Sequence, residues 1–168
     1  HRLKTASLTV NDVIAALEDC DHVSPRLIDL TANVFHTTDI IESIDAVFDA
    51  KGQVRSNASS KLIHIREEMV RLRRAINRQF LKDLKRFKER GWLADTNEGF
   101  INNRRVLAVN STHKRKVTGT ALGQSKNGSI TFIEPAANVS LNFEMEMLID
   151  DERKEILRIL RALSAHTR

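Results

Sequence analysis

The sequence predicts a mainly α-helical fold, in which long antiparallel helices form a coiled-coil bundle and a small antiparallel β-sheet is inserted at about residues 100–134. Apolar residues recur every three to four positions on both sides of this insertion, as on helices with one buried stripe. Between the helices the spacing changes to the alternation typical of strands. The hydrophobic content is 41% of 168 residues, which allows an ordinary core. We therefore expect a helical region at 1–98, a β-rich region at 99–136 and a returning helix at 137–168.

The first part of the chain contains two helix candidates. Residues 10–20 form a short one. A second begins at Ser24 and Pro25, because a capping serine followed by proline is typical of a helix start. Its apolar seam predicts one helix of about seven turns and consists of Leu27, Leu30, Val34, Ile41, Ile44 and Phe48. Gly52 then suits the left-handed conformation that follows many helices.

The next helix is the longest that the sequence predicts, from Ser59 to about Trp92, and Gly91 is expected to end it. Its seam spans about 38 Å at 1.5 Å per residue. The seam residues are Leu62, Ile65, Met69, Leu72, Ile76, Phe80, Leu84 and Phe87.

Three strand candidates follow, at 105–109, 116–124 and 129–133, and their order suggests an antiparallel meander. Asn127-Gly128 is a strong signal for a two-residue hairpin, because both residues tolerate positive φ. Pro135 ends the sheet. A helical pattern resumes near Val139 and runs back beside the long helix, with a seam of Met145, Leu148, Ile149, Ile156, Leu160 and Leu163.

Positive charge is concentrated on the sheet. The chain has a formal net charge of +5, and no Asp or Glu occurs between Gly99 and Ile133. Phosphate groups of a nucleic acid are the expected partner of the cations in this window, although lysines also protect sheet edges from aggregation. The candidate nucleic-acid-binding residues are Arg104, Arg105, Lys114, Arg115, Lys116 and Lys126.

The long helix is also basic, with ten Lys and Arg against four acids between Arg66 and Arg90. Pairing with the acidic returning helix is the simplest explanation of this charge, but it can neutralise only part of it.

No catalytic or metal site is predicted. Gly123 and Gly128 have the spacing of a phosphate-binding loop, but Ser129 stands where that loop requires lysine. Cys20 and His22 lack a second pair with zinc-ligand spacing. A single cysteine favours a reducing compartment, the cytoplasm, and no apolar run has the length of a membrane span.

Four short motifs, in order along the chain, resemble one known family. Gly52-Gln-Val-Arg-Ser-Asn-Ala-Ser59 with Leu62 and Ile65-Arg66 is similar to G-x-V-x-D-x-A-S-x-x-L-x-x-I-R. Arg104 to Val109 is similar to R-Y-V-L-P-V. Ser125 to Pro135 is similar to S-x-S-G-x-T-x-F-I-E-P, and Leu141-Asn142 with Glu152 to Leu160 resembles the helix that follows. Together they resemble the lever and clamp region of MutS-type ATPases, most closely the bacterial branch associated with suppressing recombination. The chain departs from these patterns at four positions. Ser56 replaces the acid, Arg105 the aromatic residue, Ala108 the proline and Asn127 the serine.

The resemblance implies a non-catalytic fragment of a DNA mismatch repair or recombination-suppressing ATPase. In that family, helical levers connect a dimeric ATPase to clamps that close around double-stranded or branched DNA. ATP and Mg²⁺ are then expected only in an ATPase domain beyond Arg168, and the full-length protein is expected to be a homodimer. Two alternatives stay open: a clamp that contacts ribosomal RNA, and a coiled-coil dimerisation or interaction module whose charge is incidental.

Overall fold

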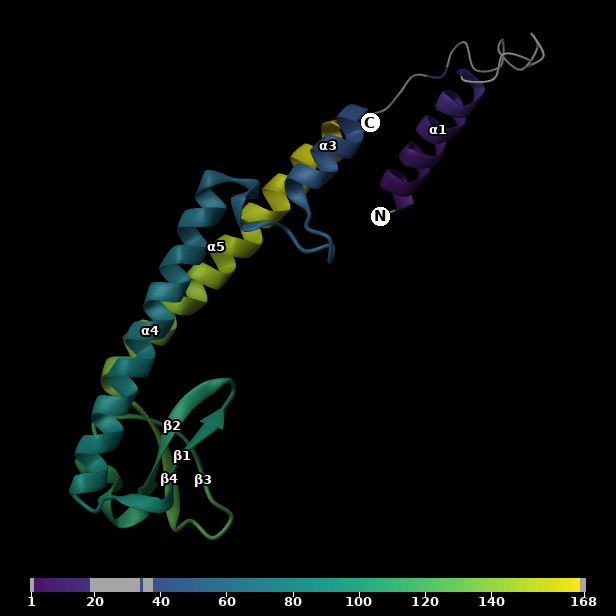
Figure 1. Ribbon diagram of the computed structural model, residues 1–168. Helices are drawn as coiled ribbons and strands as arrows, with labels where there is room; N and C mark the ends of the chain where they lie inside the picture. Colours follow the sequence, from purple (N-terminus) through teal and green to yellow (C-terminus); the bar gives the residue numbers. More distant parts are fainter. Residues whose placement is uncertain (1, 19–33, 35–37, 167–168) are drawn as a thin grey trace. The chain divides into compact units, whose positions relative to one another are not determined.

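The computed structural model describes residues 2–18, 34 and 38–166 (Figure 1). The chain divides into two compact units. The first comprises residues 1–63 and 153–168, and the second comprises residues 64–152. The two longest helices, α4 (Ser60–Glu89) and α5 (Ala136–His166), contribute to both units.

In the first unit, α1 (Arg2–Glu18) lies beside α3 (Thr38–Val47). Lys4 joins the two helices by an ion pair with Asp45, in which Nζ lies 2.6 Å from Oδ2. After α3 the chain turns back at Gly52, which has the expected positive φ of 76°. A short 3₁₀ helix, η1 (Ser56–Ala58), then leads to α4.

The second predicted helix is not one continuous element. Val34 has no helical structure and its side chain is 42% exposed, whereas α3 begins only at Thr38. The prediction of about seven unbroken turns is therefore wrong. Threonine and valine around this position lower helix propensity, because branching at Cβ restricts the side chain against the preceding turn. The predicted helix start at Ser24 and Pro25, the seam residues Leu27 and Leu30, and the Cys20–His22 pair lie outside the described residues.

The first unit contains a buried carboxylate that links α5 to the start of α4. Glu155 on α5 is 2% exposed and accepts hydrogen bonds from the Ser59 hydroxyl (2.7 Å) and the Arg158 guanidinium (2.6 Å). The hydrogen bonds from Arg158 and then Ser59 lower the pKa of Glu155 from 4.5 to about 2. The Ser59 hydroxyl also caps α4 by accepting from the Leu62 amide.

In the second unit, α4 and α5 lie side by side and antiparallel (Figure 1). Their shared core contains Ile65, Met69 and Leu72 from α4 and Met145 from α5. The seam predicted for α4 is confirmed, because every residue in it is buried or half-buried. The seam of α5 is wrong at Ile149, which is 43% exposed. Polar side chains occupy inner positions of α5, so an apolar pattern alone does not locate its inner face.

Gly91 ends α4 as predicted, with a φ of 67°. The Trp92 amide donates to the Phe87 carbonyl and the Gly91 amide to the Lys88 carbonyl, which together define a Schellman motif. The accompanying apolar contact is a stacked pair of rings, Phe87 and Trp92, with centroids 5.7 Å apart. This motif fixes the direction in which the chain enters the sheet.

The sheet contains four antiparallel strands, β1 (Leu93–Ile101), β2 (Arg104–Asn110), β3 (Gly119–Gln124) and β4 (Ile130–Pro135), in the order β1-β2-β4-β3. The sheet thus begins earlier than residue 100, and its order is not that of a meander. The sequence pattern missed β1 because its centre is polar and irregular: Asn97 has a φ of 56°, and the pairing with β2 shifts register there.

The two hairpins also differ from expectation. Asn102 and Asn103, with φ values of 50° and 63°, form the two-residue turn between β1 and β2. The Asn127-Gly128 hairpin exists, but its loop covers residues 125–129 and only Gly128 has positive φ. The Asn127 side chain instead accepts hydrogen bonds from the hydroxyls of Ser125 and Ser129.

One face of the sheet packs against the end of α4, where Phe80 and Phe87 contact Leu107, Val109 and Ile133. Val106 and Ala108 alternate with these residues along β2, yet they are also fully buried. The sheet curves so strongly that Ile101 on one edge strand reaches Gly123 on the other edge strand. Burial on both faces makes the sheet a rigid support for its loops.

Candidate nucleic-acid interface

The loops at one end of the sheet converge on the end of α4, and we call this end the tip (residues 90–93, 110–116 and 124–130). A short 3₁₀ helix, η2 (Ser111–Lys116), follows β2 there. The Ser111 amide donates to the Ser129 carbonyl (2.9 Å), and its hydroxyl donates to the Gly128 carbonyl (2.6 Å). These bonds hold η2 against the β3–β4 loop, so cations that are distant in sequence come to the same end.

Four of the six predicted residues lie at the tip and are exposed: Lys114, Arg115, Lys116 and Lys126. Within the described residues, none of the four has an ion pair with a carboxylate. The Lys116 ammonium instead lies 5.6 Å from the centre of the Trp92 ring. The tip thus carries positive charge that no acidic side chain of the described structure neutralises.

The structure adds Arg90 to this cluster. Its guanidinium lies 5.0 Å from the Trp92 ring centre, so Trp92 has contacts with both Arg90 and Lys116. The His113 ring is 6.2 Å away from the same indole. Sequence reasoning placed Arg90 on the basic helix without assigning it to the tip. Its position directly before Gly91 was the available signal, because a residue preceding a helix-ending glycine lies where the chain turns into the sheet.

Arg104 lies at the opposite end of the sheet from the tip. It donates to Glu134 (2.9 Å), which is fully buried, and to Glu146 on α5 (2.6 Å). The other Glu134 oxygen accepts from the Asn142 amide at 2.6 Å. The hydrogen bonds to Glu146 and then Glu134 raise the pKa of Arg104 above its ordinary value. This arginine therefore ties the sheet to α5.

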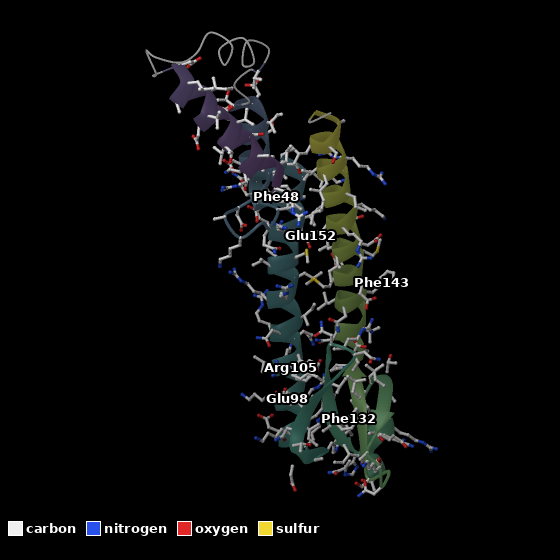
Figure 2. All side chains as sticks on the ribbon, turned by 90° about the vertical axis from the view of Figure 1, so that its right-hand side faces the viewer. Phe48, Glu98, Arg105, Phe132, Phe143 and Glu152 are labelled. Carbon is white, nitrogen blue, oxygen red and sulfur yellow. The ribbon has the colours of Figure 1, made fainter. Side chains whose placement is uncertain are left out.

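Arg105 is similarly engaged. It forms a two-point ion pair with Glu98 at 2.9 and 3.0 Å, and it donates to the Asn77 side chain at 2.6 Å. Its guanidinium lies 4.4 Å from the ring centre of Phe80. Figure 2 shows Arg105 and Glu98 together at the sheet end of α4. The stretch from Gly99 to Ile133 thus lacks acids only in the sequence. In the folded chain, carboxylates from outside this stretch lie against both arginines.

Comparison with known proteins identifies relatives over most of the chain. No family model matches it. A protein named endonuclease MutS2 from Streptococcus equi subsp. equi is 40% identical over 126 residues, which is 75% of this chain. Proteins of the same name from Streptococcus agalactiae serotype Ia and Streptococcus pyogenes serotype M5 are each 34% identical over 164 residues, 96% of this chain. The chain is a member of the MutS-type family.

This MutS-type chain spans 16% of the length of the first relative and 20% of the other two. In the part of the chain that the structure describes, no three His, Cys, Asp or Glu side chains gather as metal ligands do. No described helix has both the length and the apolar character needed to cross a membrane.

Proposed function

We propose that this chain is a non-catalytic DNA-binding part of a MutS-type protein, in which α4 and α5 act as a lever and the sheet acts as a clamp. The clamp holds the backbone of double-stranded or branched DNA. The observation that carries this proposal is the group of exposed, unneutralised cations at the tip. The similarity to proteins named endonuclease MutS2 supports it, because an endonuclease acts on nucleic acid.

The tip suits backbone contact rather than base reading. Lysine and arginine on mobile side chains attract phosphates without regard to sequence. η2 has only six residues, which is too short to present a recognition helix to the major groove. Trp92 already packs against Phe87 and two cations, so its ring is not a free platform for stacking on a base.

The wider role is part of the same proposal. The whole protein would be a cytoplasmic homodimer whose ATPase domain, with its ATP and Mg²⁺, lies outside this chain. The described residues supply the grip on DNA, and the ATPase would open and close it. The two paired arginines, Arg104 and Arg105, are proposed to support the sheet rather than to contact phosphate.

The test is a salt titration with labelled duplexes of several sequences, read by fluorescence anisotropy. The tip variant is Lys114→Gln/Arg115→Gln/Lys126→Gln. It leaves Lys116 in place, because this lysine contacts the Trp92 ring. Trp92 is the only tryptophan of the chain, so its emission gives a second measure of binding at the tip. The slope of log K against log salt should become shallower by up to about 2.7, since each phosphate contact contributes about 0.9. The loss should be equal for all sequences.

A matched control removes the same number of charges from the first unit, with Lys51→Gln/Arg153→Gln/Arg161→Gln. It should bind like the unaltered chain. Equal slopes for the tip and control variants would refute the tip as the contact surface. Tighter binding of structured RNA than of duplex DNA would make RNA the partner. Failure to bind either, together with self-association in sedimentation, would favour the dimerisation module.

A further inference from the structure

The outward side of α4 carries an unusual excess of positive charge. Between Met69 and Lys88 the chain has eight lysines and arginines and a single acid, Asp83. Asp83 is 3% exposed and is bound by Gln79 and Arg86, so it contributes no negative charge to the surface. Over about 28 Å of helix, the exposed side of α4 thus carries cations and no exposed acidic residue.

The returning helix does not neutralise this charge. Within the described second unit, Glu152 pairs with Arg66, which precedes the basic stretch, and Glu146 pairs with Arg104 of the sheet. Arg71 and Lys85 have acidic neighbours on α4 itself, at Glu68 and Glu89. Among the described residues, the cations of the stretch without an ion pair are Arg73, Arg74, Arg78, Lys82 and Lys88.

Three of these cations form a regular row, which we call the track: Arg74, Arg78 and Lys82. They are spaced four residues apart, so they share one face and follow each other at about 6 Å along the axis. All three are exposed, and the apolar seam of α4 lies on the opposite side. The row leads along α4 toward the tip, where Arg90 continues the positive charge.

The track is suited to a regular polyanion and not to a protein partner. The exposed apolar residues nearest to it, Val70 and Leu81, lie about 16 Å apart along the helix and form no contiguous patch. The buried core of a protein interface is more apolar than its rim and is depleted of charged residues, which the track does not match. A phosphodiester backbone requires only cations at repeated intervals of this size.

We propose that the track is a second phosphate-binding surface for duplex DNA, which extends the contact from the tip along α4. This inference rests on the proposed function and adds a site to it. From Arg74 to Arg90 the helix covers about 24 Å, which corresponds to about seven base pairs at 3.4 Å each. Binding along this length would orient the lever relative to the duplex held at the tip.

The test uses the full chain with a 25-base-pair duplex and the variant Arg74→Gln/Arg78→Gln/Lys82→Gln. Glutamine is a good helix former, so α4 should persist, and circular dichroism checks this. The slope of log K against log salt should become shallower by up to about 2.7. The control Lys51→Gln/Arg153→Gln/Arg161→Gln also replaces two arginines and one lysine, but in the first unit. It should leave the slope unchanged. If the triple variant unfolds, Arg78→Gln alone should lower the slope by about 0.9.

The outcomes separate the two proposals. A track variant that binds like the control, while the tip variant is weakened, overturns the track and leaves the clamp function standing. A chain that does not bind duplex DNA at all overturns both. Weakened binding by both the track and the tip variants supports two surfaces on one protein.

Discussion

Gly119 provides a sharp test of the sheet geometry. It lies at the start of β3, opposite Pro135 on β4. A Cβ added at this position would lie 2.1 Å from the Glu134 carbonyl oxygen and 2.9 Å from the Ile133 Cγ2. The obstacle is main chain, which cannot rotate away as a side chain does. Gly119→Ala must therefore push the two strands apart.

The expected cost is at the upper end of the overpacking range, about 3 kcal/mol. For a chain of this size, that corresponds to a fall of about 6–12 °C in the melting temperature. The loss should appear first in the second unit, because β3 is an edge strand of its sheet. Detachment of β3 also displaces the β3–β4 loop and should weaken DNA binding at the tip.

Gly123→Ala is the matched control, since it adds the same methyl group to the same strand. Its new Cβ would meet only the Ile101 Cδ1, at 3.2 Å, which is the flexible end of a side chain. We expect a fall of no more than about 1 kcal/mol, within the range of tolerated packing changes. Thermal unfolding followed by circular dichroism measures both variants. Equal melting temperatures for the two would refute the close approach of β3 to the Glu134 carbonyl.

Further changes test the helices and the ion pairs. In urea unfolding, Leu72→Ala should lower the free energy of unfolding by about 2–5 kcal/mol, because it leaves a cavity. Leu81→Ala on the exposed side should lower it by well under 1 kcal/mol. Similar values for the two variants would show that the seam is misplaced. The pKa of Glu155 is lowered to about 2 in the folded chain. The ionised carboxylate therefore stabilises the fold above the unfolded pKa of 4.5, and this stabilisation is lost as the pH falls toward 2. Glu155→Gln should flatten the pH dependence of the unfolding free energy between these values, and an unchanged profile would contradict the pairing of Glu155. Arg104→Ala leaves Glu134 buried without its cation and should cost about 3–5 kcal/mol; a loss below 1 kcal/mol in the same unfolding assay would mean that Arg104 does not support the sheet.

The candidate site could be predicted only in part, because sequence shows where charges occur but not what neutralises them. Lys114, Arg115, Lys116 and Lys126 follow from local signals, since they stand in the short connections between the strands. Arg104 and Arg105 come from the same window, but their partners lie as many as 42 residues away in the chain. No local pattern encodes contacts of that range.

The sequence by itself determined the elements with strong periodicity. The seam of α4 and its end at Gly91 follow from side-chain spacing and from the freedom of glycine at positive φ, which are local properties of the backbone. The two-residue turn at Asn102 and Asn103 has the same kind of local cause, because asparagine tolerates positive φ.

Tertiary structure alone decided the rest. The polar strand β1 exists because β2 supplies its hydrogen bonds across an irregular register, and the order β1-β2-β4-β3 depends on how η2 carries the chain past β4. Folding also turned Asp83 inward and directed two acids of α5, Glu152 and Glu146, toward Arg66 and Arg104. The net charge of each surface was thus set by which carboxylates the fold buried or paired, and that choice left the tip and the outer side of α4 positive.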